Sequence, residues 1–157
     1  MIKICIIGLG YVGLPLCLKI SQKFETIGFD INSKRISELS IGKDSNKEFK
    51  KKEFKNKKIN FTSNINKIKD CNFFIICVPT PITKKNIPDL SPVKKSFEII
   101  SKVLKKNDLI VLESTVYPGV TLNFKKFLEK KTHLINNKDF YLCYSPERIN
   151  PGDKKNN

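Results

Sequence analysis

The feature that most constrains the fold is a glycine-rich hexapeptide near the N-terminus, GLGYVG, which spans Gly8–Gly13. It follows a β-branched, apolar run, Ile4–Ile7, and opens a segment with helical character. Gly8 would permit a tight turn, Gly10 would let the backbone approach a pyrophosphate, and Gly13 would let helix and strand pack closely. The first N–H groups of such a helix favour an anion. The hexapeptide predicts a phosphate-binding strand–turn–helix unit, with a purely structural turn as the alternative.

Asp30 distinguishes these two interpretations. It ends the second strand-like run and follows Gly8 at close to the spacing of about 20 residues that is expected of a ribose-binding carboxylate. A carboxylate there accepts hydrogen bonds from the adenosine ribose and repels the additional phosphate of NADP, so NAD is the predicted coenzyme. Lys34 and Arg35 lie just beyond Asp30, and their positive charges weigh against that choice.

Short apolar runs alternate with amphipathic stretches of helical length along the chain. The runs are Lys3–Ile7, Thr26–Asp30, Ile59–Thr62, Phe73–Val78, Leu109–Glu113 and Phe140–Tyr144. Uninterrupted apolar runs are typical of parallel strands that helices cover on both faces. The pattern predicts an α/β fold with a doubly wound, Rossmann-type, mostly parallel sheet of six strands. We expect one domain over residues 1–150 of the 157, with 151–157 as a truncated tail.

Two of the expected helices carry start and stop signals. Ser91-Pro92 predicts an N-cap followed by a proline in the first turn. Asn32 or Ser33 is expected to cap an earlier helix, and Gly42 to end it. The proline-rich stretch 79–92 is expected to be a stiff loop at the carboxyl end of a strand, where ligands bind in such sheets.

The charge of the chain is strongly positive, with 30 Lys+Arg against 15 Asp+Glu. A polyanionic partner is one explanation. However, the excess is mostly lysine spread over the whole chain, and arginine, which suits bidentate phosphate contacts better, occurs only at Arg35 and Arg148. We therefore prefer a compositional bias and predict neither a nucleic-acid nor a membrane partner. The highly charged stretch Lys43–Lys58 is expected to be a solvated helix or loop.

The five cysteines include no CxxC pair. Cys5, Cys77 and Cys143 lie in strand-like runs, which predicts buried thiols in a reducing cytoplasm, with neither disulfides nor a metal site. The apolar stretch Ile4–Leu18 is interrupted by glycines and a proline and is shorter than the roughly 18 to 20 residues of a membrane span. We expect it to form part of the folded domain.

Polar residues also follow two later strand-like runs. Thr80 comes after the fourth run, and Glu113 and Thr115 stand at the end of the fifth. The threonines are candidates for binding a nicotinamide ribose or holding a water molecule, whereas Glu113 is a candidate for a buried structural carboxylate. Ordinary turn chemistry is the alternative for each of them.

Five segments in the same order, GLGYVGLP, GFDIN, VPTPI, ESTVYPG and YSPERINPGDK, resemble the nucleotide-sugar 6-dehydrogenases, which include UDP-glucose and GDP-mannose dehydrogenases. The pieces GKDSNKE, NIPDLSP and SPERINPGDK most resemble the branch that oxidises UDP-N-acetylgalactosamine or UDP-N-acetylglucosamine for surface polysaccharides. The resemblance covers essentially the whole chain. It implies NAD as coenzyme, a UDP-sugar substrate, a cytoplasmic location and a homodimer for the full-length enzyme. UDP-glucose and UDP-N-acetylmannosamine remain alternative substrates, and a stand-alone NAD-binding module is an alternative function.

The resemblance also implies roles for individual residues. The implied coenzyme contacts are Gly8, Gly10, Tyr11, Val12, Gly13, Asp30, Arg35, Thr80 and Thr115. Thr115 is also implied in catalysis, because the matching threonine lies near the reacting carbon, where a water is positioned. Glu147 matches a carboxylate with an acid/base or water-ordering part. Arg148 and Ile149 match positions that touch the sugar nucleotide.

The implied reaction is a four-electron oxidation of the sugar C6 alcohol to a carboxylate with two NAD⁺, through a thiohemiacetal and a thioester on a cysteine. In the family that cysteine lies in a GGSC-type motif, which does not occur in these 157 residues. We therefore expect this chain to correspond to the first third to half of such an enzyme. By itself it should bind NAD weakly and should not turn over.

Overall fold

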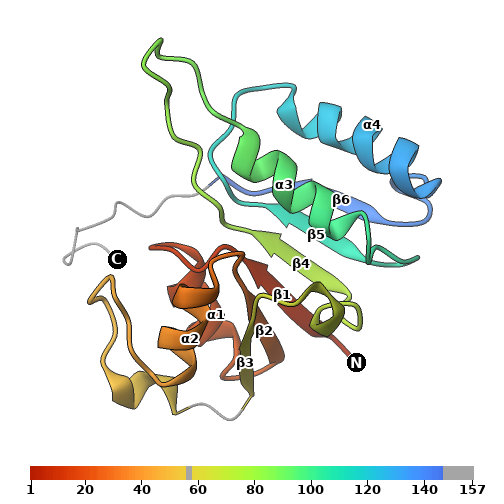
Figure 1. Ribbon diagram of the computed structural model, residues 1–157. Helices are drawn as coiled ribbons and strands as arrows, with labels where there is room; N and C mark the ends of the chain where they lie inside the picture. The colour runs from red at the N-terminus through yellow and green to blue at the C-terminus, as the bar shows by residue number, and fades with distance from the viewer. Residues whose placement is uncertain (56–57, 147–157) are drawn as a thin grey trace.

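The computed structural model describes residues 1–55 and 58–146 (Figure 1). The strands are β1 (Lys3–Ile7), β2 (Glu25–Phe29), β3 (Ile59–Thr62), β4 (Phe73–Ile76), β5 (Leu109–Leu112) and β6 (Tyr141–Tyr144). The α-helices are α1 (Gly13–Ile20), α2 (Ser33–Ser40), α3 (Ser91–Ile100) and α4 (Val120–Thr132). Two short 3₁₀ turns, η1 (Lys51–Phe54) and η2 (Ile65–Lys67), flank β3.

The strands form one sheet in the order β3-β2-β1-β4-β5-β6, and every neighbouring pair is parallel. This confirms the predicted doubly wound, Rossmann-type sheet of six strands. The order of strands reverses between β1 and β4, because the chain builds outwards from β1 on one side and from β4 on the other. Such a reversal is the place where open α/β sheets bind ligands.

Several strands are shorter than the apolar runs predicted. Asp30 follows β2, Cys77 and Val78 follow β4, and Glu113 follows β5, whereas the runs had included them. The central strand β1 ends at Ile7 because Gly8, which has a positive φ, turns the chain away from the sheet. These side chains therefore lie in loops at the carboxyl edge and are available to a site there.

The alternating side chains of the strands pack into two cores, one on each face of the sheet. Ile6 belongs to a cluster with buried residues of α1 and α2, whereas its neighbour Ile7 belongs to a cluster with α3 and α4. In this second cluster the rings of Phe97 and Phe124 stack with centroids 4.2 Å apart. Each large apolar side chain buried in this way stabilises the fold by about 1.5–3 kcal/mol, and the two cores hold the sheet rigidly between the helices.

The helix caps follow the sequence signals in one case and depart from them in another. The Asn32 side chain accepts hydrogen bonds from the first N–H groups of α2, as predicted, and this helix ends shortly before Gly42. In contrast, Ser91 lies inside α3, and Leu90 occupies the N-cap position. The prediction of a Ser91 cap is wrong because Asp89 makes the preceding turn, with its carboxylate 2.8 Å from the Ser91 N–H.

The proline-rich stretch is a loop over residues 79–90, as predicted, and its last two residues, Ser91 and Pro92, begin α3. It leaves β4 and projects beyond the carboxyl edge of the sheet before it enters α3 (Figure 1). Its two arms are joined by an antiparallel bridge between Ile82 and Pro88 and by a 2.8 Å hydrogen bond from the Thr83 N–H to the Ile87 carbonyl. The loop is thus braced by its own backbone.

Four of the five cysteines are buried and all five are free thiols. The prediction of a buried thiol is wrong for Cys143, which is exposed. Cys143 lies in β6, an edge strand that pairs with β5 alone and is largely exposed. Burial raises the pKa of Cys17 to about 12. Within residues 1–55 and 58–146, no helix combines the length and the apolar character that a membrane crossing requires.

Candidate dinucleotide-binding site

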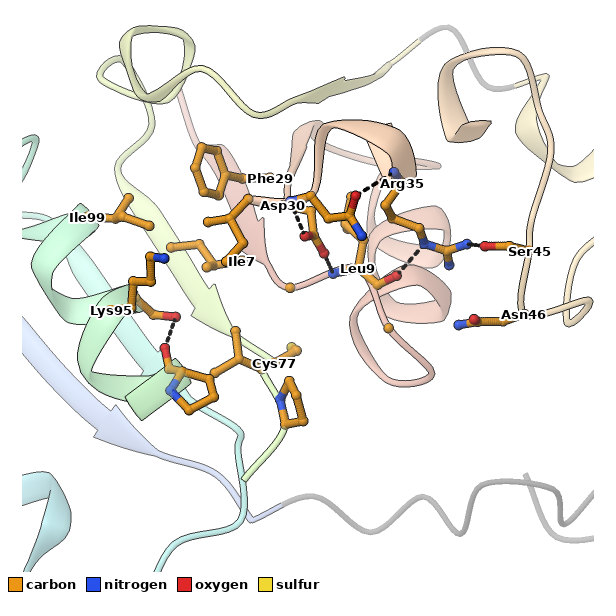
Figure 2. A pocket seen from close by; sticks show the side chains of 18 residues that line it. Ile7, Leu9, Phe29, Asp30, Arg35, Ser45, Asn46, Cys77, Lys95 and Ile99 are labelled. Carbon is orange, nitrogen blue, oxygen red and sulfur yellow. Dashed lines mark hydrogen bonds between the residues drawn. The ribbon is translucent and has the colours of Figure 1, made fainter. Parts of the chain in front are cut away.

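A cavity of about 490 Å³ lies over the carboxyl ends of β1, β2 and β4, at the point where the strand order reverses (Figure 2). Its walls come from the loops that follow these three strands, from one side of α3 and from residues 45–46. The side chains in the deeper part are mostly apolar, including Ile7, Phe29 and Ile99. The shape and position suit a flat ring held between apolar side chains, with polar groups at the rim.

The glycine-rich turn has the geometry that its sequence predicts. Gly8 has a φ of +92°, and it turns the chain from β1 into the loop. A Cβ at Gly13 would lie 1.8 Å from the Gly8 carbonyl oxygen, so only glycine lets α1 begin this close to the turn. A Cβ at Gly10 would meet no atom within 4 Å, so this position faces open space. Gly8 and Gly10 line the cavity, and the space beside Gly10 leaves room for a phosphate group.

The remaining residues of the hexapeptide have different positions. Val12 is the N-cap of α1, and Tyr11 is half-exposed at 51%. Neither residue lines the cavity, and nor does Gly13. The last glycine has a packing role, and direct coenzyme contacts of Tyr11, Val12 and Gly13 stay a prediction.

Asp30 lies in the cavity wall beside the glycine loop. Its Oδ2 accepts a 2.9 Å hydrogen bond from the Leu9 N–H, and its Oδ1 accepts one of 2.9 Å from the Asn32 N–H (Figure 2). The carboxylate thus fixes the glycine loop relative to the start of α2. Each carboxylate oxygen has a second lone pair, so Asp30 can also accept hydrogen bonds from ribose hydroxyls.

Arg35 reaches from α2 to the outer rim of the cavity, and its residue surface is 9% exposed. Its Nε donates to the Leu9 carbonyl at 3.0 Å, and its Nη1 donates to Asp44 Oδ1 at 2.7 Å and to Ser45 Oγ at 3.0 Å. Among the described residues, Nη2 has no hydrogen-bond partner. The described lysines of the segment Lys43–Lys58 are exposed as predicted. The prediction of a merely solvated segment is wrong for Asp44, because the ion pair with Arg35 buries it.

The two threonines meet farther along the same edge. Thr80 Oγ1 donates a 2.8 Å hydrogen bond to the Thr115 carbonyl, and Ser114 Oγ donates one of 2.7 Å to the Val78 carbonyl. These bonds join the loops after β4 and β5. Neither threonine lines the cavity itself, so their approach to a nicotinamide stays a prediction.

Glu113 lies between these loops and the cavity. The Cys77 thiol, which lines the cavity, donates to Glu113 Oε2 over 3.5 Å, and the Glu113 N–H donates to the Ile76 carbonyl at 2.9 Å. These contacts agree with a structural carboxylate, but Glu113 is half-buried and not buried as predicted. Glu147, Arg148 and Ile149 lie outside the described residues.

Sequence reasoning missed several residues of the cavity wall. Ser45 and Asn46 line it from the lysine-rich segment, where no local signal separates them from solvated neighbours. Lys95 lines it from α3, and Figure 2 shows its side chain directed towards Ile7 and Ile99. The helical repeat could have revealed Lys95, because residues three and four positions apart share a face.

Comparison with known proteins agrees with this geometry. A model of the UDP-glucose/GDP-mannose dehydrogenase family, NAD binding domain, matches residues 2–157. UDP-N-acetyl-D-glucosamine 6-dehydrogenase of Salmonella typhi is 51% identical over 156 residues, which are 98% of this chain and 37% of that protein. Protein CapL of Staphylococcus aureus is 49% identical over 153 residues, 97% of this chain and 36% of that one.

Solved structures show the same arrangement. The UDP-D-ManNAc dehydrogenase from Pyrococcus horikoshii superposes with a TM-score of 0.90 at 32% identity, over 96% of this chain and 37% of that one. The ternary complex of GDP-mannose dehydrogenase from Pseudomonas aeruginosa has a TM-score of 0.87 at 26% identity, over 94% of this chain and 36% of that one. The chain thus spans little more than a third of the length of these relatives. With a family match over nearly every residue and the glycine loop, Asp30 and the cavity in place, the chain belongs to the UDP-glucose/GDP-mannose dehydrogenase family and carries its NAD-binding domain.

Proposed function

We propose that this chain is the NAD-binding part of a UDP-N-acetylhexosamine 6-dehydrogenase, which oxidises the C6 alcohol of its sugar to a carboxylate with two NAD⁺ and supplies precursors of surface polysaccharides. The observation that carries the proposal is the meeting of Gly8, Gly10 and Asp30 in one cavity, in a chain half identical to a UDP-N-acetyl-D-glucosamine 6-dehydrogenase. UDP-N-acetylgalactosamine is the other sugar nucleotide of the proposed class.

The residues of the cavity fit the coenzyme. The open space beside Gly10 is the room that a pyrophosphate needs, and a side chain there would reduce it. Asp30 would accept the adenosine ribose hydroxyls, and the loops joined by Thr80 and Thr115 would hold the nicotinamide end. When bound, NAD supplies the hydride acceptor. The chain itself contributes binding, orientation and the exclusion of water.

The catalytic and substrate assignments are part of the same proposal. Thr115 is proposed to order a water near the reacting carbon, Glu147 to act as acid/base, and Arg148 and Ile149 to contact the sugar nucleotide. Motif resemblance supports these roles. We also propose that the whole enzyme is a cytoplasmic homodimer. Free thiols throughout the chain support a reducing compartment.

The coenzyme part of the proposal is tested by calorimetry on the purified chain with NAD⁺ and NADP⁺. We expect weak but saturable binding of NAD⁺ and weaker binding of NADP⁺, because the Asp30 carboxylate repels an additional phosphate. No detectable NAD⁺ binding by the folded chain, or a preference for NADP⁺, would overturn the proposal.

The enzymatic part is tested in a chimera. Residues 1–157 would replace the matching segment of the Salmonella typhi relative, and NADH formation from UDP-N-acetylglucosamine would be followed. We expect activity, and a loss of at least about tenfold in kcat on Thr115→Val or Glu147→Gln, the order of a general acid–base contribution. A folded chimera that binds NAD⁺ but stays inactive would favour the alternative of a stand-alone NAD-binding module.

A further inference from the structure

Asp44 is a buried carboxylate in a segment whose other charged side chains, as far as the structure describes them, are exposed. Its side chain is 0% exposed, and four donors surround it. Oδ1 accepts from Arg35 Nη1 at 2.7 Å and from the Asn46 N–H at 3.2 Å. Oδ2 accepts from the Glu48 N–H at 2.9 Å and from the Phe49 N–H at 3.2 Å. One carboxylate therefore determines the path of the chain from residue 44 to residue 49.

The electrostatics of this cluster are consistent with an ionised carboxylate. Burial alone would raise the pKa of Asp44, but the hydrogen bonds from Arg35 and from the three backbone N–H groups outweigh it, and the pKa is held below its ordinary value. Because the Arg35 guanidinium is also buried, the two charges neutralise each other away from water. Removal of one charge would leave the other without compensation, which is costly in a buried ion pair.

Arg35 connects this cluster to the coenzyme cavity. Its Nε holds the Leu9 carbonyl of the glycine loop, while its Nη1 holds Asp44 and Ser45. Figure 2 shows the guanidinium between Leu9 on one side and Ser45 on the other. The segment after α2 is thereby fixed to the glycine loop, although the two are far apart in the sequence.

Ser45 and Asn46 are the residues that this arrangement presents to the cavity. Ser45 Oγ accepts its hydrogen bond from Arg35, so its hydroxyl proton remains able to donate. Within the described part of the chain, no hydrogen bond involves the side-chain amide of Asn46, which lies at the cavity rim (Figure 2). Both lie near Arg35 and the loop after β2, which carries Asp30 and thus marks the adenosine end.

We propose that Asp44 is a positioning residue for the coenzyme: through Arg35 it fixes Ser45 and Asn46 as a wall of the cavity, where their side chains hydrogen-bond the adenosine half of NAD. This inference rests on the proposed function and deepens it. It extends the site beyond the glycine loop and Asp30 to a segment that has no coenzyme motif of its own.

Asp44→Asn is a sharp test, because the two side chains have nearly the same size. Each oxygen of Asp44 faces two donors, so the amide NH₂ of Asn would point at donors in either orientation. Ser45→Ala and Asn46→Ala remove the proposed contacts and leave both charges of the buried pair in place, and Ser45→Ala also removes one acceptor of Arg35. Asp70→Asn is the matched control, since Asp70 is exposed and precedes β4 at the opposite edge of the sheet.

Dissociation constants for NAD⁺, ADP-ribose and NMN⁺ would be measured by ligand-observed NMR, with thermal unfolding of each variant alongside. We expect Asp44→Asn to weaken the binding of NAD⁺ and ADP-ribose by about tenfold. Each alanine variant should weaken their binding by about three- to tenfold, which corresponds to the loss of a single hydrogen bond. NMN⁺, which lacks adenosine, should bind all variants as it binds the wild type, and Asp70→Asn should bind all three ligands normally.

The outcomes separate this inference from the proposed function. If the wild-type chain binds none of the ligands, the proposed function fails. If it binds NAD⁺ and the three variants bind it equally well, the inference is overturned and the proposed function stands. A lower unfolding temperature with unchanged dissociation constants, or an equal loss for NMN⁺, would reduce Asp44 to a structural residue and would overturn the inference as well.

Discussion

The addition of one methyl group should have different effects at two glycines of the same loop: a loss of stability at Gly13 and a loss of NAD⁺ binding at Gly10. At Gly13 a Cβ would lie 1.8 Å from the Gly8 carbonyl oxygen and 3.1 Å from the Cys77 Cβ. An ordinary carbon–oxygen contact is about 3.3 Å, so α1 or the turn must move by about 1.5 Å. Overpacking costs about 1–3 kcal/mol and occasionally more. Because the clash is with a backbone atom, we expect Gly13→Ala to lower the free energy of unfolding by about 3 kcal/mol. This is a large part of a typical stability of about 5–15 kcal/mol.

Gly10→Ala is the matched partner of this variant. No atom lies within 4 Å of its Cβ position, and the residue does not have a positive φ. Its free energy of unfolding should therefore change by less than about 1 kcal/mol. The methyl group would, however, stand where the pyrophosphate approaches, and we expect NAD⁺ binding to weaken by about tenfold or more, the cost of a misplaced close contact.

Thermal unfolding followed by circular dichroism, together with calorimetric titration of NAD⁺, distinguishes the two effects. For a chain of this size, about 3 kcal/mol lowers Tm by roughly 6–12 °C. Gly13→Ala should show that loss, whereas Gly10→Ala should unfold close to the wild-type temperature. A wild-type Tm for Gly13→Ala, or a wild-type dissociation constant for Gly10→Ala, would refute the assignment of packing to one glycine and phosphate access to the other.

Three further predictions concern charges and thiols. Asp30→Asn should weaken the binding of NAD⁺ by about tenfold or more, as for loss of hydrogen bonds to a charged group. Calorimetry should also show a smaller preference for NAD⁺ over NADP⁺, and an unchanged ratio of the two dissociation constants would contradict the role of Asp30 at the ribose. Brief iodoacetamide treatment of the native chain should label Cys143 but not Cys5 or Cys17, whose pKa values burial raises; mass spectrometric detection of label at Cys17 before unfolding would count against this packing. Because the pKa of Asp44 is lowered on folding, its ionised carboxylate contributes fully to the stability of the fold above about pH 4. This contribution is lost as the pH falls through the lower pKa of the folded state. Asp44→Asn should therefore show a shallower loss of stability in acid, measured by urea unfolding, and an identical slope would disprove the linkage.

The parts of the fold that local sequence encodes were predictable. The glycine-rich turn, the apolar runs and the Asn32 cap each depend on neighbouring residues. The structure confirms the turn and the cap, and it places a strand at every run. The carboxylate of Asp30 was found because its distance along the chain from Gly8 reflects one strand–helix–strand unit. For the same reason the doubly wound sheet could be predicted before its strand order was known.

The failures have a common origin in long-range structure. Whether Cys143 is buried depends on which strand lies at the edge, and the order of strands is not a local property. Asp44 is buried by Arg35, a residue in another element, although its own neighbours are solvated. Ser45 and Asn46, which follow Asp44 directly, line the cavity beside that pair. The glycine side of the site was therefore readable from the sequence, and the opposite side was not.

The position of β1 and β4 in the middle of the sheet has a consequence for amide hydrogen exchange. Both strands have hydrogen-bonded neighbours on each side and residues packed into both cores, whereas β6 has one neighbour and is largely exposed. Exchange in β1 and β4 should require unfolding of the whole domain, and that in β6 only a local opening. The glycine loop follows β1 and the proline-rich loop follows β4, the two strands in which we expect the slowest amide exchange. The phosphate subsite is thus anchored in the last part of the molecule to open, and fluctuations at the edge can occur without disturbing it.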